Sequence, residues 1–155
     1  MKIIVDSREQ NALSFEHKYI TEVKVAKLDY ADYIVEFEDG YRPPFCFERK
    51  TLGDLFGTLG KGYPRFKREL IRAQEAGVKV FIVIEGSLSK IIGGYKYSTL
   101  EGISILRKLL TLWIRHGIGF HCFKDRGEIS TFMVETFATL GKEYLRVGKT
   151  NHNAP

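Results

Sequence analysis

Two short runs of the chain, residues 32–37 and 45–50, carry two carboxylates and an ammonium group that could act together: Asp32, Glu48 and Lys50. In residues 45–50, FCFERK, aromatic side chains alternate with others as a pleated, partly buried strand requires, so Glu48 and Lys50 face the same way. Residues 32–37, DYIVEF, alternate in the same manner, and turn-forming Gly and Pro residues separate the two runs. We therefore expect a hairpin with its aromatic residues on one face. The side chains expected on the other face are Asp32, Glu36, Glu48 and Lys50.

Such a group could hydrolyse phosphodiester bonds with a divalent metal ion. Mg²⁺ takes oxygen ligands and keeps several waters, so Asp32, Glu48 and a substrate phosphate could hold it. The metal would acidify a water, and the ammonium of Lys50 could orient the nucleophile or stabilise the developing negative charge. A Glu-x-Lys pattern alone is more often just the solvated end of a strand. The spacing by itself leaves both interpretations open.

A longer pattern resembles the XPF family of structure-specific endonucleases. The family signature is Gly-Asp, a variable gap, and then Glu-Arg-Lys-x-x-x-Asp. This chain has Ala31-Asp32 and, after a gap, the run from Glu48 to Asp54. The opening residues 5–9, VDSRE, are similar to the family's first motif and occur in the same order. The resemblance covers about residues 2–145.

The resemblance implies an α/β fold of the restriction-endonuclease-like type, with a mixed central β-sheet flanked by helices. It also implies that the protein cuts DNA, in a flap, fork or junction, with Mg²⁺ or Mn²⁺ as cofactor. Asp32 and Glu48 would be metal ligands, Asp6 could be a third, and Lys50 would assist. Arg49 would contact phosphate or brace the site. The other residues assigned to the site are Arg8, Glu9 and Asp54.

Two features depart from the family pattern. Ala31 stands where the family usually has Gly, which restricts the backbone of the turn but removes no ligand. Family members usually continue into a tandem helix-hairpin-helix DNA-binding domain, for which the sequence leaves no room before Pro155. We therefore expect cleavage itself to carry over from the family more safely than a preference for one type of branch.

Hydrophobic periodicity predicts strands that alternate with helices, which favours one α/β domain with a mixed sheet. Thr51 can cap a helix that begins at Leu52, with Asp54 in its first turn, so Asp54 also has a purely structural explanation. The expected strands are 2–5, 22–28, 32–37, 45–50, 78–84 and 118–123, and further helices are expected at 13–20, 65–76, 99–115 and 128–144. The hairpin should be antiparallel and the later strands parallel.

Basic residues beside the expected site could bind DNA. Arg65, Arg68 and Arg72 share one face of the helix at 65–76, where a phosphate backbone would fit, although a solvated helix face is the simpler alternative. Gly57, Gly60 and Gly62 predict a mobile loop that carries a further candidate, Lys61. Tyr63 could stack on a base, but packing in the core is the stronger expectation. The loop at 93–97 could also reach nucleic acid, but a polar surface loop is the better interpretation.

Composition narrows the function classes only in part. The chain has 24 Lys and Arg against 19 Asp and Glu, a moderately basic balance that suits a polyanionic partner without proving one. The two cysteines lie in apolar strands and indicate reduced, buried thiols. No signal peptide and no apolar run of membrane-spanning length is present, so we expect an intracellular protein, located wherever the DNA is, with no membrane partner. His116 and His121 lack partners at ligand spacing, which argues against zinc.

At 155 residues the chain is long enough for one well-buried domain, which we place at 1–147 with a flexible tail at 148–155. Apolar residues surround most of the helix at 99–115, which predicts a second buried face, against another helix of this chain or a second copy. In the resembled family the last helices form a dimer interface, so we expect a homodimer through the C-terminal helices. One alternative is a non-catalytic DNA-binding or scaffold subunit of a nuclease complex, disfavoured because Glu-Arg-Lys is intact. Another is a resolvase or restriction-type nuclease with a different substrate.

Overall fold

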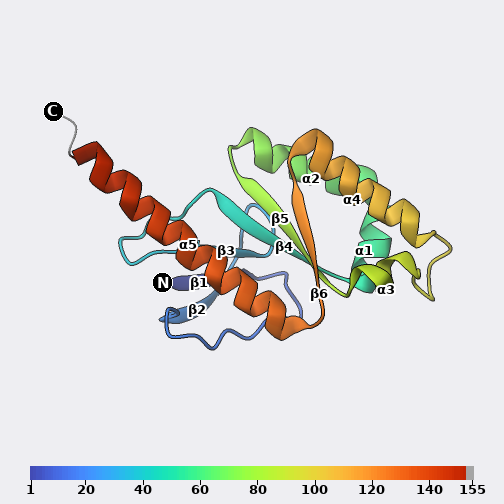
Figure 1. Ribbon diagram of the computed structural model, residues 1–155, viewed down its shortest axis with the longest axis horizontal. Coiled ribbons are helices and arrows are strands. Elements are labelled where there is room, and N and C mark those ends of the chain that lie inside the picture. Colours follow the sequence, from blue (N-terminus) through green and yellow to red (C-terminus); the bar gives the residue numbers. More distant parts are fainter. Residues whose placement is uncertain (153–155) are drawn as a thin grey trace.

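Six strands form one mixed sheet in the order β2-β1-β3-β4-β5-β6 in a computed structural model (Figure 1). The structure describes the backbone of residues 1–152 and the side chains of residues 1–147. The strands are β1 Lys2–Asp6, β2 Glu22–Ala26, β3 Tyr33–Glu36, β4 Phe45–Thr51, β5 Lys79–Glu85 and β6 Gly119–Phe123. Strand β3 is antiparallel to both of its neighbours, β1 and β4, whereas β4, β5 and β6 are parallel to one another. The predicted mixed sheet and its antiparallel hairpin are confirmed.

Helices cover both faces of this sheet (Figure 1). They are α1 Leu52–Leu59, α2 Tyr63–Glu75, α3 Leu88–Ile92, α4 Gly102–His116 and α5 Arg126–His152. The first four share a core on one face of the sheet, with buried residues such as Phe56, Leu70 and Ile105. Helix α5 packs on the other face, where Phe137 meets the aromatic side of the hairpin. The catalytic candidates therefore sit in a sheet that is held from both sides.

The β3–β4 hairpin sorts its side chains as the alternation predicts. Tyr33 pairs with Phe47, and both are fully buried on the α5 side. Cys46, on the opposite side, packs under α1 and α2, and Glu48 and Lys50 follow it at the same spacing of two. Glu36 follows Ile34 at a spacing of two and so shares the predicted face, but it is not beside Glu48 and Lys50. It lies at the far end of β3, where it forms ion pairs with side chains outside the site, Arg42 and Lys2.

The helix predicted at 13–20 is absent, because tertiary contacts hold this segment against β3. The Leu13 backbone N–H donates to the Tyr33 hydroxyl at 3.1 Å, and the Phe15 ring packs edge-on against Tyr33 at 5.8 Å. The backbone of this segment thus finds a partner in a side chain from another element. The segment remains irregular.

The mobile loop predicted from Gly57, Gly60 and Gly62 was also wrong. Gly57 lies inside α1, and only residues 60–62 connect α1 to α2. A Cβ at Gly60 would stand 2.6 Å from the Phe56 carbonyl oxygen, so the glycine is required by the close approach of the backbone there. Gly60 and Gly62 lie in a tight turn between the two helices.

Helix α4 begins at Gly102, three residues later than predicted. Its buried positions form one stripe that includes Ile105 and Leu109, whereas Trp113 and Ile114 are 56% and 77% exposed. The second buried face is therefore not formed within the part of the chain that the structure describes. Cys46 is buried and Cys122 half-buried, and both are free thiols as predicted.

Helix α5 continues into the segment predicted to be a flexible tail. Its backbone is helical to His152, while residues 153–155 of the predicted tail lie outside the described residues. The domain boundary at 147 and the flexibility of the tail therefore stay predictions. In the part of the chain that the structure describes, no helix is long and apolar enough to cross a membrane.

Candidate active site

Asp32 and Glu48 line one cavity of about 250 Å³ between the sheet and α2. The carboxyl ends of β1, β4 and β5 lie on the side of the sheet where β3 begins, so residues far apart in the sequence meet there. The Tyr33–Phe47 pair sets the hairpin register that puts Asp32 beside Glu48. Basic side chains complete the wall of the cavity: Arg8, Arg65 and Arg72.

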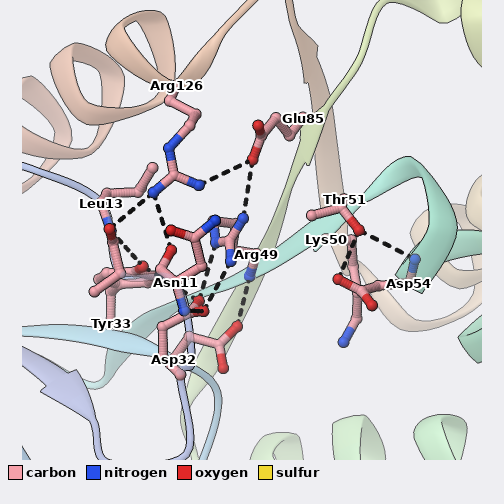
Figure 2. A network of polar contacts seen from close by, with 12 residues as sticks. Asn11, Leu13, Asp32, Tyr33, Arg49, Lys50, Thr51, Asp54, Glu85 and Arg126 are labelled. Carbon is pink, nitrogen blue, oxygen red and sulfur yellow. Dashed lines mark hydrogen bonds and ion pairs between the residues drawn. The ribbon is translucent and has the colours of Figure 1, made fainter.

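Asp32 is held in an electrostatically unfavourable position. Burial, and then the negative charge of Glu48, raise the pKa of the Asp32 carboxyl from 3.8 to about 7. The backbone N–H of Arg49 donates to the Asp32 carboxylate at 2.8 Å and favours its charged form, but only in part (Figure 2). A divalent cation shared by the two carboxylates would relieve their repulsion, and two carboxylates plus water and phosphate are a donor set that suits Mg²⁺.

The turn before Asp32 is strained. Ala31 has φ of 54°, a left-handed conformation that costs a residue with a Cβ about 1–2 kcal/mol. Gly, the residue of the family pattern, would adopt it without that cost. The turn is therefore kept despite the substitution, and backbone strain of this kind is characteristic of functional sites.

Lys50 is fixed beside Glu48. Its Nζ lies 2.6 Å from Glu48 Oε1 and 5.0 Å from the centroid of the Phe66 ring. Burial opposes the charge of Lys50, but the charge of Glu48 prevails and the pKa of the ammonium is raised. Lys50 is therefore positively charged at neutral pH and held in place, as an assisting group must be.

Asp54 has the structural role that its position in α1 predicts. The Asp54 N–H donates to the Thr51 hydroxyl at 3.2 Å, and this hydroxyl donates to Asp54 Oδ2 at 2.7 Å (Figure 2). Thr51 thus caps α1. Asp54 also lines a hollow next to the cavity together with Lys50, so its proximity to the site is compatible with the second role.

Asp6 is occupied by other donors. The Arg8 side chain donates to both of its carboxylate oxygens at 2.8 Å, and the backbone N–H groups of Arg8 and Leu28 donate at 2.7 and 2.9 Å. The bonds from the Arg8 side chain lower the pKa of Asp6 to about 2. As placed, Asp6 anchors Arg8 at the cavity, and a role as third metal ligand has the least support. Among the described residues no cluster of three or more His, Cys, Asp or Glu side chains could hold a metal.

Arg49 lies behind the cavity in a buried network of ions. Its side chain is 5% exposed and binds both oxygens of Glu9, at 2.8 and 2.9 Å, and Glu85 at 2.9 Å. Glu85 also accepts a bond from Arg126, which begins α5 and donates to the carbonyl of Asn11 (Figure 2). These contacts favour the bracing role over phosphate contact.

Sequence reasoning missed Glu85 and Arg126. Glu85 ends an apolar strand as Asp6 does, and that shared position was the available signal. No sequence signal identifies Arg126, because only the packing of α5 brings it next to Glu85 at the end of β5.

The predicted DNA-binding residues are divided by the fold. Arg65 and Arg72 face the cavity, whereas Arg68 is exposed but does not line it. Tyr63 packs on the core as expected, with the Lys108 ammonium 5.0 Å from its ring centroid. Lys61 lines a separate hollow of about 670 Å³ at the far end of α1.

The chain matches the family model of the ERCC4 domain over residues 5–136. It is similar to the solved structure of XPF from Aeropyrum pernix, with a TM-score of 0.70 and 22% identity over 97% of this chain and 69% of that one. The XPF from Aeropyrum pernix in complex with DNA gives a TM-score of 0.64 and 22% identity over 92% of this chain and 65% of that one. The chain thus spans about two thirds of these structures, and the likeness confirms the predicted fold. No curated protein matches the chain in sequence.

Proposed function

Because this chain belongs to the ERCC4-domain family, as the XPF-like motifs predicted, we propose that it is a metal-dependent DNA endonuclease that hydrolyses phosphodiester bonds in branched DNA. The family match supports a DNA nuclease, and the Aeropyrum pernix protein of the same fold forms a complex with DNA. The observation that carries the proposal is that Asp32 and Glu48 line one cavity together with three arginines, while the Lys50 ammonium lies 2.6 Å from Glu48. A role in DNA repair or recombination, and an intracellular location, follow from this function.

The side chains divide the chemistry between them. Asp32 and Glu48 would hold Mg²⁺ or Mn²⁺, which when bound supplies charge neutralisation and a more acidic water. Lys50, held by Glu48, orients the attacking water and stabilises the negative charge that develops on the phosphate. Arg8 and Arg65 on the cavity wall bind the phosphates on either side of the cut.

The test is cleavage of labelled duplex, single-stranded, 3′-flap and four-way-junction DNA, with Mg²⁺ and with EDTA. Cutting should require the metal, and Asp32→Ala or Glu48→Ala should abolish it while DNA binding persists. Glu36→Ala, at the far end of the same hairpin, is the matched control and should cut like the unmodified protein. Binding without cutting in Mg²⁺ or Mn²⁺ would favour the non-catalytic alternative.

We also propose a homodimer through α4, β6 and α5. Strand β6 is an edge of the sheet, and α4 and α5 pack on opposite faces beside it (Figure 1). Trp113 and Ile114 of α4 and Phe132 of α5 are exposed apolar side chains on these flanking helices. An open edge strand beside exposed apolar side chains is typical of a surface that a second copy covers. The same helices are those that the family resemblance implies.

A further inference from the structure

A groove leads from the candidate active site along α1, formed by three hollows that share walls. The active-site cavity shares Arg65, Phe66 and Glu69 with a second hollow of about 410 Å³. The second hollow shares Gly53 and Gly57 with the third, of about 670 Å³. We call this series of hollows the α1 groove.

The far end of the α1 groove is basic and aromatic. Lys61 and Lys108 line the third hollow, and no acidic residue is among its described lining. Tyr97 is 76% exposed, and its ring is held edge-on by Tyr95 at 5.5 Å, with the Lys96 ammonium 4.7 Å from its centroid. An exposed ring supported in this way, next to positive charge, suits the stacking of a nucleic-acid base.

Gly57 has no packing explanation. A Cβ at Gly53 would lie 3.0 Å from the Tyr95 hydroxyl and one at Gly60 would lie 2.6 Å from a backbone oxygen, whereas at Gly57 nothing lies within 4 Å. Gly inside a helix is unfavourable relative to Ala, so the fold alone would not select it here. Gly57 opens onto the wall between the second and third hollows, where bare backbone allows a ligand to approach closely.

We propose that the α1 groove guides a single DNA strand from the metal site to the Tyr97 ring. This inference rests on the proposed nuclease function and adds to it a path for the unpaired strand of a branched substrate. The eight residues of α1 span about 12 Å, which corresponds to about four nucleotides of a stacked strand. In a duplex the base faces are stacked on one another, so only an unpaired strand could present one to Tyr97.

The test is fluorescence anisotropy with oligothymidylates of increasing length, on the full chain and without divalent metal so that no cutting occurs. Affinity should rise with length until the groove is filled, at about four nucleotides, and then level off. Tyr97→Ala and Gly57→Leu should each weaken binding about tenfold, through the lost stacking partner and the blocked groove. Gly57→Ala should raise the Tm by about 2–4 °C, since Ala favours the helix.

Two controls have similar exposed sites outside the groove. Tyr19→Ala removes another exposed ring and Thr131→Leu adds bulk to an exposed position of α5, and both should bind like the unmodified chain. If Gly57→Leu and Tyr97→Ala bind normally, the inference is overturned, while metal-dependent cutting lost in Asp32→Ala would still support the nuclease. Binding that depends on Gly57 and Tyr97 without any cutting would support the groove and remove the nuclease function.

Discussion

Asp32 is the residue at which stability and the proposed chemistry oppose each other most. Its carboxyl is partly buried beside Glu48, with a pKa of about 7, and the preceding Ala31 is strained. Both features lower the stability of the metal-free fold. The fold tolerates both features because the Arg49 N–H of β4 donates to the Asp32 carboxylate, which partly stabilises its charge and fixes its position. Perturbed carboxyls of this kind are typical of sites where a cation or a proton is exchanged.

Asp32→Asn should stabilise the metal-free protein at pH 8 much more than at pH 5. Since folding raises the pKa of Asp32 from 3.8 to about 7, its stabilising contribution is complete below pH 3.8 and is lost as the pH rises through 7. Three pKa units correspond to at most about 4 kcal/mol, and the uncharged Asn escapes that loss.

Urea unfolding at the two pH values measures this difference, with Glu38→Gln, an exposed acid, as the control. Added Mg²⁺ should stabilise the unmodified protein at pH 8 and leave the Asn variant unchanged. An Asn variant that is less stable than the unmodified chain at both pH values would contradict the claim that the charged Asp32 destabilises the fold.

At the scale of elements, the buried ion network joins the loop after β1 and the start of α5 to the paired strands β4 and β5. Arg49 from β4 meets Glu9 from the loop after β1 and Glu85 at the end of β5, and Arg126 extends the network to the start of α5. Because the same Arg49 donates its backbone N–H to Asp32, the network also sets the geometry of the hairpin. It couples the helix on one face of the sheet to the site on the other.

Glu9→Gln should destabilise the fold by about 3 kcal/mol, because it leaves the buried Arg49 guanidinium without its bidentate partner. Glu36→Gln, which removes a partner from the half-exposed Arg42, should cost less than about 1 kcal/mol. Urea unfolding at pH 7 compares the two variants. Equal losses would mean that Arg49 is compensated by other groups and that the network is not a brace.

At the scale of the whole molecule, the two edges of the sheet differ. Strand β2 forms one edge and exposes Val23 and Val25, whereas Trp113 and Ile114 of α4 are exposed on the side of β6, the other edge. The active-site cavity lies at β3 and β4, in the centre of the sheet, so a second copy at β6 would leave it open.

Trp113→Glu should convert the proposed dimer to a monomer, because a charge at the centre of an apolar interface is desolvated without a partner. Light scattering at increasing protein concentration measures the mass. Val25→Glu places the same charge on the exposed opposite edge and should leave the dimer intact. An unmodified chain that is monomeric at high concentration, or equal dissociation by both variants, would rule out this interface.

Short-range pattern was sufficient for much of the fold. Period-two alternation predicted the hairpin and the opposite faces of Phe47 and Glu48, because side-chain direction in a strand depends only on neighbouring residues. The capping of α1 by Thr51 and the buried stripe of α2 were predictable for the same reason. The family motif then identified which carboxylates to consider, Asp32 and Glu48 above all.

What only the tertiary structure decided depends on contacts between distant segments. Residues 13–20 are irregular because the Leu13 N–H bonds to the Tyr33 hydroxyl. The Asp6 carboxylate is occupied because the distant Leu28 N–H also donates to it. The ion network reaches α5 because Arg126 pairs with Glu85. The groove beside Gly57 arises only when α1 packs against the 95–100 segment. Residue types and periodicity set which side chains are available and where each points along its own strand or helix, whereas the packing of elements determines which of them share a partner, a charge or a cavity.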